Sequence, residues 1–193
     1  LNTAADRSVI EALHPQALII ACGAQPVTPP VPGMDQSFVM GFTEAICHPE
    51  RIGKQVVIIG GGTIGAEIGL ELTEREGRQV TIVEMTDTLA SQGNLLYRIA
   101  LRQKLDPLTN FTALTQTRCI QIGDHEVEIL HQKEQRKLRA DTVIIAAGVR
   151  TNRAFVNSLY GICPQTFEAG DALQPRKIQE AVFEGTGVAL SIG

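Results

Sequence analysis

The sequence has little of the features that mark several common functional classes. It contains no tryptophan, and only 4% of its 193 residues are aromatic. Its four cysteines include no CxxC pair and do not have the spacing of a disulfide framework, a zinc ribbon or a thioredoxin-type motif. We therefore expect reduced, buried thiols in a cytoplasmic protein.

The sequence also lacks an excess of basic residues and a long hydrophobic run. It carries 17 basic and 21 acidic side chains, whereas proteins that bind nucleic acid show a clustered basic face. The longest apolar stretch, residues 56–66, includes four glycines. It falls well short of the roughly 18–20 apolar residues that cross a bilayer. We expect neither a nucleic-acid partner nor a membrane partner.

No part of the sequence predicts a secretion signal, a metal site or a hydrolase nucleophile. Residues 1–7 lack the charged region and apolar core of a signal peptide. The absence of an initiator methionine indicates a processed chain or a piece of a longer one. The histidines are scattered without metal-ligand spacing, and no serine lies in a GxSxG elbow. We therefore assign no catalytic residue and no metal ligand.

A βαβ unit is the strongest pattern in the sequence. Residues 55–59 (QVVII) predict a buried strand that runs directly into a glycine-rich loop, residues 60–65. Apolar residues then recur at helical spacing, and residues 79–83 (QVTIV) predict a second strand that ends at Glu84. A strand, a glycine loop, a helix and a strand are typical of a Rossmann-type parallel sheet.

The glycine loop has the GxGxxG spacing of a dinucleotide-binding turn. Gly60 permits a tight turn, Gly62 leaves room for a diphosphate, and Gly65 lets the helix approach the strand. The first amides of the helix then face the phosphates. The alternative is a βαβ turn of an α/β protein that binds no dinucleotide.

Two carboxylates accompany the loop. Glu84, nineteen residues beyond Gly65, has the position that accepts hydrogen bonds from ribose hydroxyls, and it would repel a 2′-phosphate. Residues 85–87 contain no arginine, so the sequence favours NAD(H) over NADP(H). The simpler interpretation of Glu84 is a solvated residue at a strand end. Glu67, taken alone, is interpreted as a first-turn carboxylate that stabilises the helix dipole.

The other segments predict a second, divided part of the fold. Residues 17–21 and 142–146 are short apolar runs typical of buried parallel strands, and residues 111–138 predict an antiparallel meander. Residues 95–105 and the segment from Pro175 to about residue 192 predict helices. Four of the nine prolines lie in residues 25–33, which indicates a stiff crossing between domains.

Several of these segments resemble one family of flavoproteins. They are ALIIACGAQPVTPPVPG, VVIIGGGTIGAEIGLEL, VEMTDTLA, ADTVIIAAGVRTN and AGDALQPRKIQEAVFEG. The sequence is similar to the FAD/NAD(P)-binding, pyridine nucleotide-disulfide oxidoreductase-like portion of NADH:flavin oxidoreductases that are fused to an old-yellow-enzyme barrel. That branch includes 2,4-dienoyl-CoA reductases, 2-enoate reductases and trimethylamine dehydrogenase.

The resemblance implies an α/β fold with a Rossmann-type parallel sheet, a small antiparallel meander and partial FAD-domain segments. The expected domains are a partial FAD-domain segment (1–46), an NAD(H)-binding domain (47–150) and a C-terminal FAD-domain segment (151–193). It places Glu67 near the nicotinamide, and Gly170 and Asp171 in a flavin-binding motif. The candidate cofactor-binding residues are Gly60, Gly61, Gly62, Thr63, Ile64, Gly65, Glu67, Glu84, Gly148, Gly170 and Asp171.

The resemblance also implies an activity that this sequence carries only in part. In the parent enzyme NADH reduces FAD, and electrons pass through a 4Fe-4S cluster and FMN to an enoate or dienoyl-CoA substrate. This sequence contains no second GxGxxG loop and no cluster of four cysteines. Its expected partners are a dinucleotide and the missing FAD-domain and barrel segments, and a homo-oligomer is possible. The alternatives are part of a stand-alone NADH oxidase or ferredoxin reductase, and a nucleotide-sensing module without catalysis.

Overall fold

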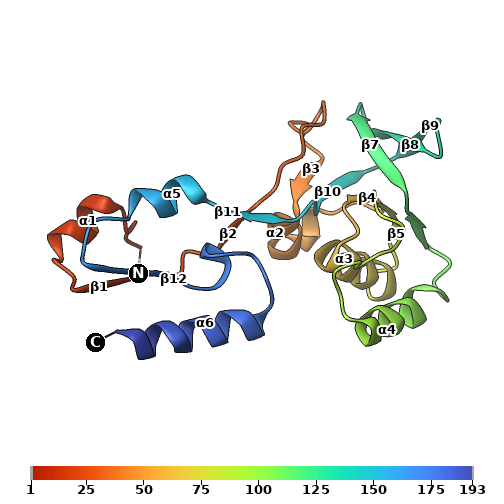
Figure 1. Ribbon diagram of the computed structural model, residues 1–193. Coiled ribbons are helices and arrows are strands. Elements are labelled where there is room, and N and C mark those ends of the chain that lie inside the picture. Colours follow the sequence, from red (N-terminus) through yellow and green to blue (C-terminus); the bar gives the residue numbers. More distant parts are fainter. Residues whose placement is uncertain (1, 193) are drawn as a thin grey trace. The chain divides into compact units, whose positions relative to one another are not determined.

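The computed structural model describes residues 2–192 and divides the chain into two compact units (Figure 1). Unit 1 combines the residues up to Gln25 with those from Val149 onward, and unit 2 comprises Pro26–Gly148. No helix within residues 2–192 is long and apolar enough to cross a membrane.

Unit 2 contains a five-stranded parallel sheet with the strand order β3-β10-β4-β5-β6. In the middle of the sheet, Val57 pairs with Val143 on one side and with Thr81 on the other. The strands are β3 (Val39–Gly41), β10 (Thr142–Ile145), β4 (Gln55–Ile59), β5 (Gln79–Val83) and β6 (Phe111–Leu114). The parallel order confirms the predicted Rossmann-type sheet.

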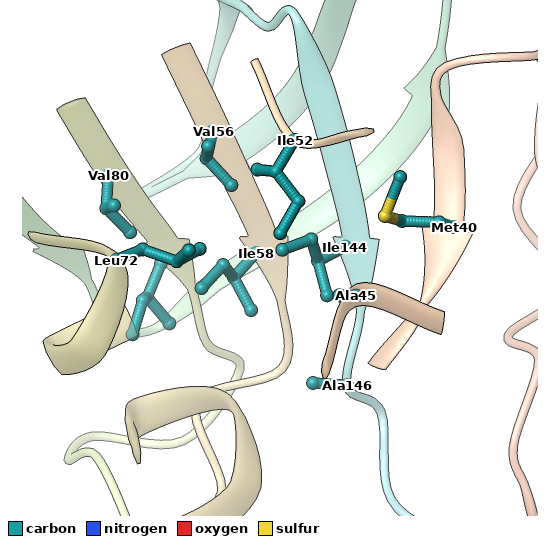
Figure 2. Packing of buried hydrophobic residues seen from close by; sticks show 10 residues of the cluster. Met40, Ala45, Ile52, Val56, Ile58, Leu72, Val80, Ile144 and Ala146 are labelled. Atoms are coloured by element: carbon teal, nitrogen blue, oxygen red, sulfur yellow. The ribbon is translucent and has the colours of Figure 1, made fainter. Parts of the chain in front are cut away.

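The two faces of this sheet are covered by different layers. Alternate residues of β4 point to opposite faces, so Val56 and Ile58 pack beneath the helices and Val57 beneath the meander. Figure 2 shows the first of these clusters, in which Val56, Ile58 and Ile144 lie together. The covering elements are α2 (Phe42–Cys47), α3 (Thr63–Glu74) and α4 (Leu95–Leu105) on one face, and β7 (Thr117–Ile122), β8 (Glu126–His131) and β9 (Glu134–Arg139) on the other. A short 3-10 helix, η1 (Pro49–Arg51), precedes β4.

Unit 1 is built around a two-stranded parallel pair, β1 (Ala17–Ile20) with β12 (Gln165–Glu168). Helices α1 (Arg7–Ala12) and α5 (Arg153–Ser158) contribute to a small apolar cluster with Ile20. All residues of helix α6 (Ile178–Ser191) lie at or near the surface, and the exposed fractions of Ile178 and Phe183 are 84% and 79%. The remaining elements are β2 (Ala24–Pro26), β11 (Val149–Thr151) and η2 (Gly170–Ala172).

Two sequence-based boundaries differ from the structure. The first expected domain, residues 1–46, extends too far, because β3 pairs with β10 and Phe38 packs under the sheet of unit 2. Residues 26–46 therefore belong to unit 2, and the second boundary falls after Gly148 rather than after residue 150. The expected meander also begins too early, since β6 joins the parallel sheet beside β5.

Helix α3 and the turn after β4 approach each other closely. A Cβ atom on Gly65 would lie 2.0 Å from the carbonyl oxygen of Gly60 and 3.2 Å from the Cβ of Ala146. Apart from Gly62 itself and its two chain neighbours, no described residue would have an atom within 4 Å of a Cβ atom on Gly62. Gly65, as predicted, is therefore the residue that lets the helix and the strand pack together.

Replacing Gly65 with alanine should lower the free energy of unfolding of unit 2 by roughly 1–3 kcal/mol, the usual cost of overpacking. The loss is expected although alanine is the better helix former. Urea unfolding followed by circular dichroism measures it, with Gly62→Ala as the matched control. A Gly65→Ala protein as stable as the wild type would contradict the close approach.

The cysteines are free, but their burial differs from the prediction. Cys22 and Cys47 are exposed, Cys163 is half-buried, and Cys119 is buried in the meander. The prediction of buried thiols was therefore wrong for Cys22 and Cys47. Burial raises the pKa of the Cys119 thiol to about 11.

Alkylation with iodoacetamide at pH 8 should label Cys22 and Cys47 first and leave Cys119 unlabelled in the folded protein. Only the thiolate reacts, and both burial and the raised pKa keep the Cys119 thiolate scarce. Peptide mass spectrometry over time identifies the sites, and the urea-unfolded chain serves as the control. Labelling of Cys119 at the rate of Cys22 would show that the meander opens.

Candidate functional site

The glycine loop follows β4 at the carboxyl edge of the parallel sheet. Gly60 has a φ of +104°, and a Cβ atom there would lie 2.3 Å from the carbonyl oxygen of Ala146. Its amide donates to the carbonyl oxygen of Val83 (2.9 Å). A side chain at Gly60 would thus be both strained and obstructed, which explains the glycine.

The first turn of α3 presents backbone amides beside open space. Gly62 is the N-cap residue and has no side chain to accept a hydrogen bond from the amide of Ile64 or Gly65. The first amides of a helix carry the positive end of the helix dipole. Gly62 and Thr63 are exposed, and the space where a Cβ atom of Gly62 would lie is open.

Glu84 lies against the glycine loop. One oxygen of its carboxylate, Oε2, accepts a hydrogen bond from the amide of Gly61 (2.6 Å), and Oε1 accepts one from the amide of Thr86 (2.7 Å). The amide of Ala90 in turn donates to the carbonyl oxygen of Gly61 (2.7 Å). The structure thus brings together the loop and the acidic residue that the sequence assigned to the same site.

Glu67 has a partner that the sequence did not reveal. It is the fifth residue of α3, which has no acidic residue in its first turn. The interpretation of Glu67 as a first-turn carboxylate was therefore wrong. Its Oε1 accepts a hydrogen bond from the hydroxyl of Tyr97 on α4 (2.8 Å). Burial, and then the Glu67 carboxylate, raise the pKa of Tyr97.

Gly148 lies at the same edge of the sheet. It follows β10, has a φ of +99°, and accepts a hydrogen bond from the amide of Val27 through its carbonyl oxygen (2.9 Å). Strand β10 pairs with β4 in parallel, and the carboxyl ends of neighbouring parallel strands meet at one edge of the sheet. Gly148 therefore follows β10 at the edge where the glycine loop follows β4. All candidate residues of unit 2 therefore belong to segments at this edge.

A pocket of about 310 Å³ lies beside the residue that follows Glu84. Besides Met85, its lining includes Thr117, Arg118, Leu130 and Lys133. The amide of Thr117 donates to the carbonyl oxygen of Glu84 (2.8 Å), which fixes β7 next to the end of β5. The fold therefore brings two basic residues, Arg118 and Lys133, to a pocket that Met85 also lines, although residues 85–87 contain no arginine.

Gly170 and Asp171 lie in unit 1. Gly170 has a φ of +63°, and its amide donates to Oε2 of Glu184 (2.8 Å). The carboxylate of Asp171 accepts a hydrogen bond from the amide of Arg176 (3.2 Å), and its carbonyl oxygen accepts one from the hydroxyl of Thr151 (2.7 Å). The structure therefore gives the two residues a defined turn, η2, that begins a connection to α6.

An acidic residue precedes this turn in β12. The Glu168 side chain is only 9% exposed, and its carboxylate accepts hydrogen bonds from Arg153 (2.7 Å) and from the hydroxyl of Tyr160 (2.7 Å). Arg153 also donates to the carbonyl oxygen of Leu173 (2.8 Å).

Within residues 2–192, no group of three or more histidine, cysteine, aspartate or glutamate residues is arranged to hold a metal ion.

Comparisons with known proteins find similar reductases. Bilirubin reductase of Mediterraneibacter gnavus is 32% identical over 96% of this chain, and cinnamate reductase of Clostridium sporogenes is 27% identical over 100% of this chain. The structure of a 2-naphthoyl-CoA reductase in complex with 2-naphthoyl-CoA matches the whole chain with a TM-score of 0.91 and 28% identity. The chain spans 29% of the length of each of these three proteins.

A family model confirms the resemblance seen in the sequence. The model of pyridine nucleotide-disulphide oxidoreductases matches residues 5–185, and proteins of this family bind FAD and NAD(P). The match includes the glycine loop and Glu84 in unit 2 and the η2 turn in unit 1. The chain belongs to the pyridine nucleotide-disulphide oxidoreductase family.

Proposed function

We propose that unit 2 binds NAD(H), with the diphosphate on the first turn of α3 and a ribose on Glu84. The hydrogen bond from the Gly61 amide to the Glu84 carboxylate carries this proposal, because it places the acidic group beside the glycine loop. The open space at Gly62 and the positive φ of Gly60 support the same assignment.

The residues of the site have separable tasks. The amides of the first turn bind an anionic diphosphate through hydrogen bonds and the helix dipole. Each oxygen of the Glu84 carboxylate accepts one backbone hydrogen bond, and each has a second lone pair for a ribose hydroxyl. The backbone bonds orient the carboxylate before the nucleotide arrives. A 2′-phosphate in that place would meet the negative charge of Glu84, which supports NAD(H) over NADP(H).

Unit 1 supplies part of a flavin-binding domain in this proposal, with Gly170 and Asp171 facing the FAD. Parallel sheets are normally covered on both faces and contain more strands than the single pair β1 and β12. The exposed apolar residues of α6 are typical of a helix that is buried in a larger protein. These observations favour completion of unit 1 by further segments of a longer enzyme.

The proposed whole enzyme is an NADH-dependent flavoprotein reductase that acts on enoate or acyl-CoA substrates. The similarity to a cinnamate reductase and a 2-naphthoyl-CoA reductase supports this substrate class. When bound to these residues, NADH would supply a hydride to FAD; an iron–sulfur cluster and FMN in other parts of the enzyme would provide the route to the substrate. The task of the present residues is to bind and orient the dinucleotide.

Calorimetric titration of the chain tests the binding site. We expect NADH to bind roughly tenfold or more tightly than NADPH, because placing like charges together costs several kcal/mol. Glu84→Gln should narrow this difference, whereas Glu74→Gln on α3 should not.

Gly62→Val is the companion variant for the loop. It should abolish NADH binding, because the added methyl groups would occupy the path of the diphosphate. It should leave the circular dichroism spectrum unchanged, because the Cβ atom lies in open space. Equal affinity for NADH and NADPH in the wild-type chain would remove the role of Glu84. Unchanged NADH affinity in Gly62→Val would exclude the loop.

A further inference from the structure

The hydrogen bond between Tyr97 and Glu67 joins α4 to the exposed side of α3. The Tyr97 hydroxyl lies 2.8 Å from Oε1 of Glu67. Glu67 follows Thr63 by one helical turn, so both lie on the same side of α3. Thr63 and Glu67 are exposed, and Tyr97 is half-buried. The contact therefore fixes a negative charge one turn from the amides that are proposed to bind the diphosphate.

Tyr97 is held firmly by its own surroundings. Its amide donates to the side chain of Asn94, the N-cap residue of α4 (2.8 Å). Its ring packs against the cluster that contains Ala66, Ala90 and Leu101. The same connection from β5 to α4 contacts the glycine loop through the bond from the Ala90 amide to the Gly61 carbonyl oxygen. The position of the phenol is thus tied to the position of the loop.

Without the hydrogen bond from Tyr97, the Glu67 carboxylate would be attracted to the N-terminus of α3. Side chains on a helix point back toward its N-terminus and cover the preceding turn. A free carboxylate is also attracted by the positive end of the helix dipole. Since Gly62 offers no side chain to cap α3, the Glu67 carboxylate would lie over the first turn. It would then oppose an incoming diphosphate by like charge and by covering the amides.

We propose that Tyr97 is a positioning residue that holds the Glu67 carboxylate away from the first turn of α3 and so keeps the diphosphate site open. This inference rests on the proposed function of unit 2. It gives the site a third element besides the loop and Glu84: a phenol that controls where a negative charge lies.

The experiment is a double-mutant cycle read by calorimetry with ADP, NADH and adenosine. Tyr97→Phe keeps the ring and removes the hydroxyl, and it should weaken binding of ADP and NADH about twofold to fivefold, the range of a helix-dipole interaction at an exposed position. Binding of adenosine, which has no phosphate, should not change. Adding Glu67→Gln to Tyr97→Phe should restore the wild-type affinity for ADP, because the competing charge is gone and ADP has no nicotinamide for Glu67 to contact.

Tyr160→Phe is the matched control. Tyr160 is the other tyrosine of the chain, and it donates to the Glu168 carboxylate in unit 1 in the same way (2.7 Å). Its replacement should leave the binding of all three ligands unchanged. Thermal unfolding of each variant separates a loss of stability from a loss of affinity, and only the charge mechanism predicts rescue by Glu67→Gln.

The possible failures are distinguishable. A wild-type chain that binds neither ADP nor NADH overturns the proposed function and this inference together. A wild-type chain that binds them, with Tyr97→Phe binding equally well, overturns the role of Tyr97 alone. Weaker binding in Tyr97→Phe without rescue by Glu67→Gln would mean that the hydroxyl acts through packing and not through the carboxylate.

Discussion

The hydrogen bond between the Gly61 amide and the Glu84 carboxylate connects the ends of two neighbouring strands, and the proposed binding site depends on it. It orients an acidic side chain with a backbone donor, so little side-chain freedom remains to be lost when a nucleotide binds. The loop can supply this donor only because Gly60 turns the chain out of β4 with a positive φ. Geometry that is already present in the free chain is what allows a small set of residues to select a ligand.

The sheet beneath the loop makes this geometry reproducible. Strands β4 and β10 bury nearly all of their residues, so a shift in register would move apolar side chains out of both clusters. The loop, Glu84 and Gly148 follow three strands that pair directly, and their relative positions are therefore set by backbone hydrogen bonds. The most buried part of unit 2 therefore fixes the relative positions of the site residues, as expected for a functional site on a rigid scaffold.

The sequence predicted the part of the site that local rules govern. Strand β4, the glycine loop, α3 and β5 follow one another in the chain, and each has a periodicity or a glycine with a local physical reason. The remaining features come from distant pairing. Strand β3 has only three residues and becomes recognisable only beside β10. Tyr97 reaches Glu67, and Arg118 and Met85 line the same pocket, through packing across unit 2. No spacing in the sequence reports such a contact.

The two units hold their functional turns by different forces. In unit 2 the loop is positioned by a buried apolar sheet, whereas in unit 1 the η2 turn is surrounded by paired charges. The Glu184 carboxylate accepts a hydrogen bond from the amide of Gly170 and forms an ion pair with Arg176. The nearly buried Glu168 forms an ion pair with Arg153. Partly buried ion pairs add little net stability because desolvation offsets their attraction, yet removing one partner is costly. Such pairs fix the geometry of a turn without supplying the burial that stabilises a domain. Covering the exposed apolar side chains of α6 would stabilise unit 1, because it would remove large apolar surfaces from water.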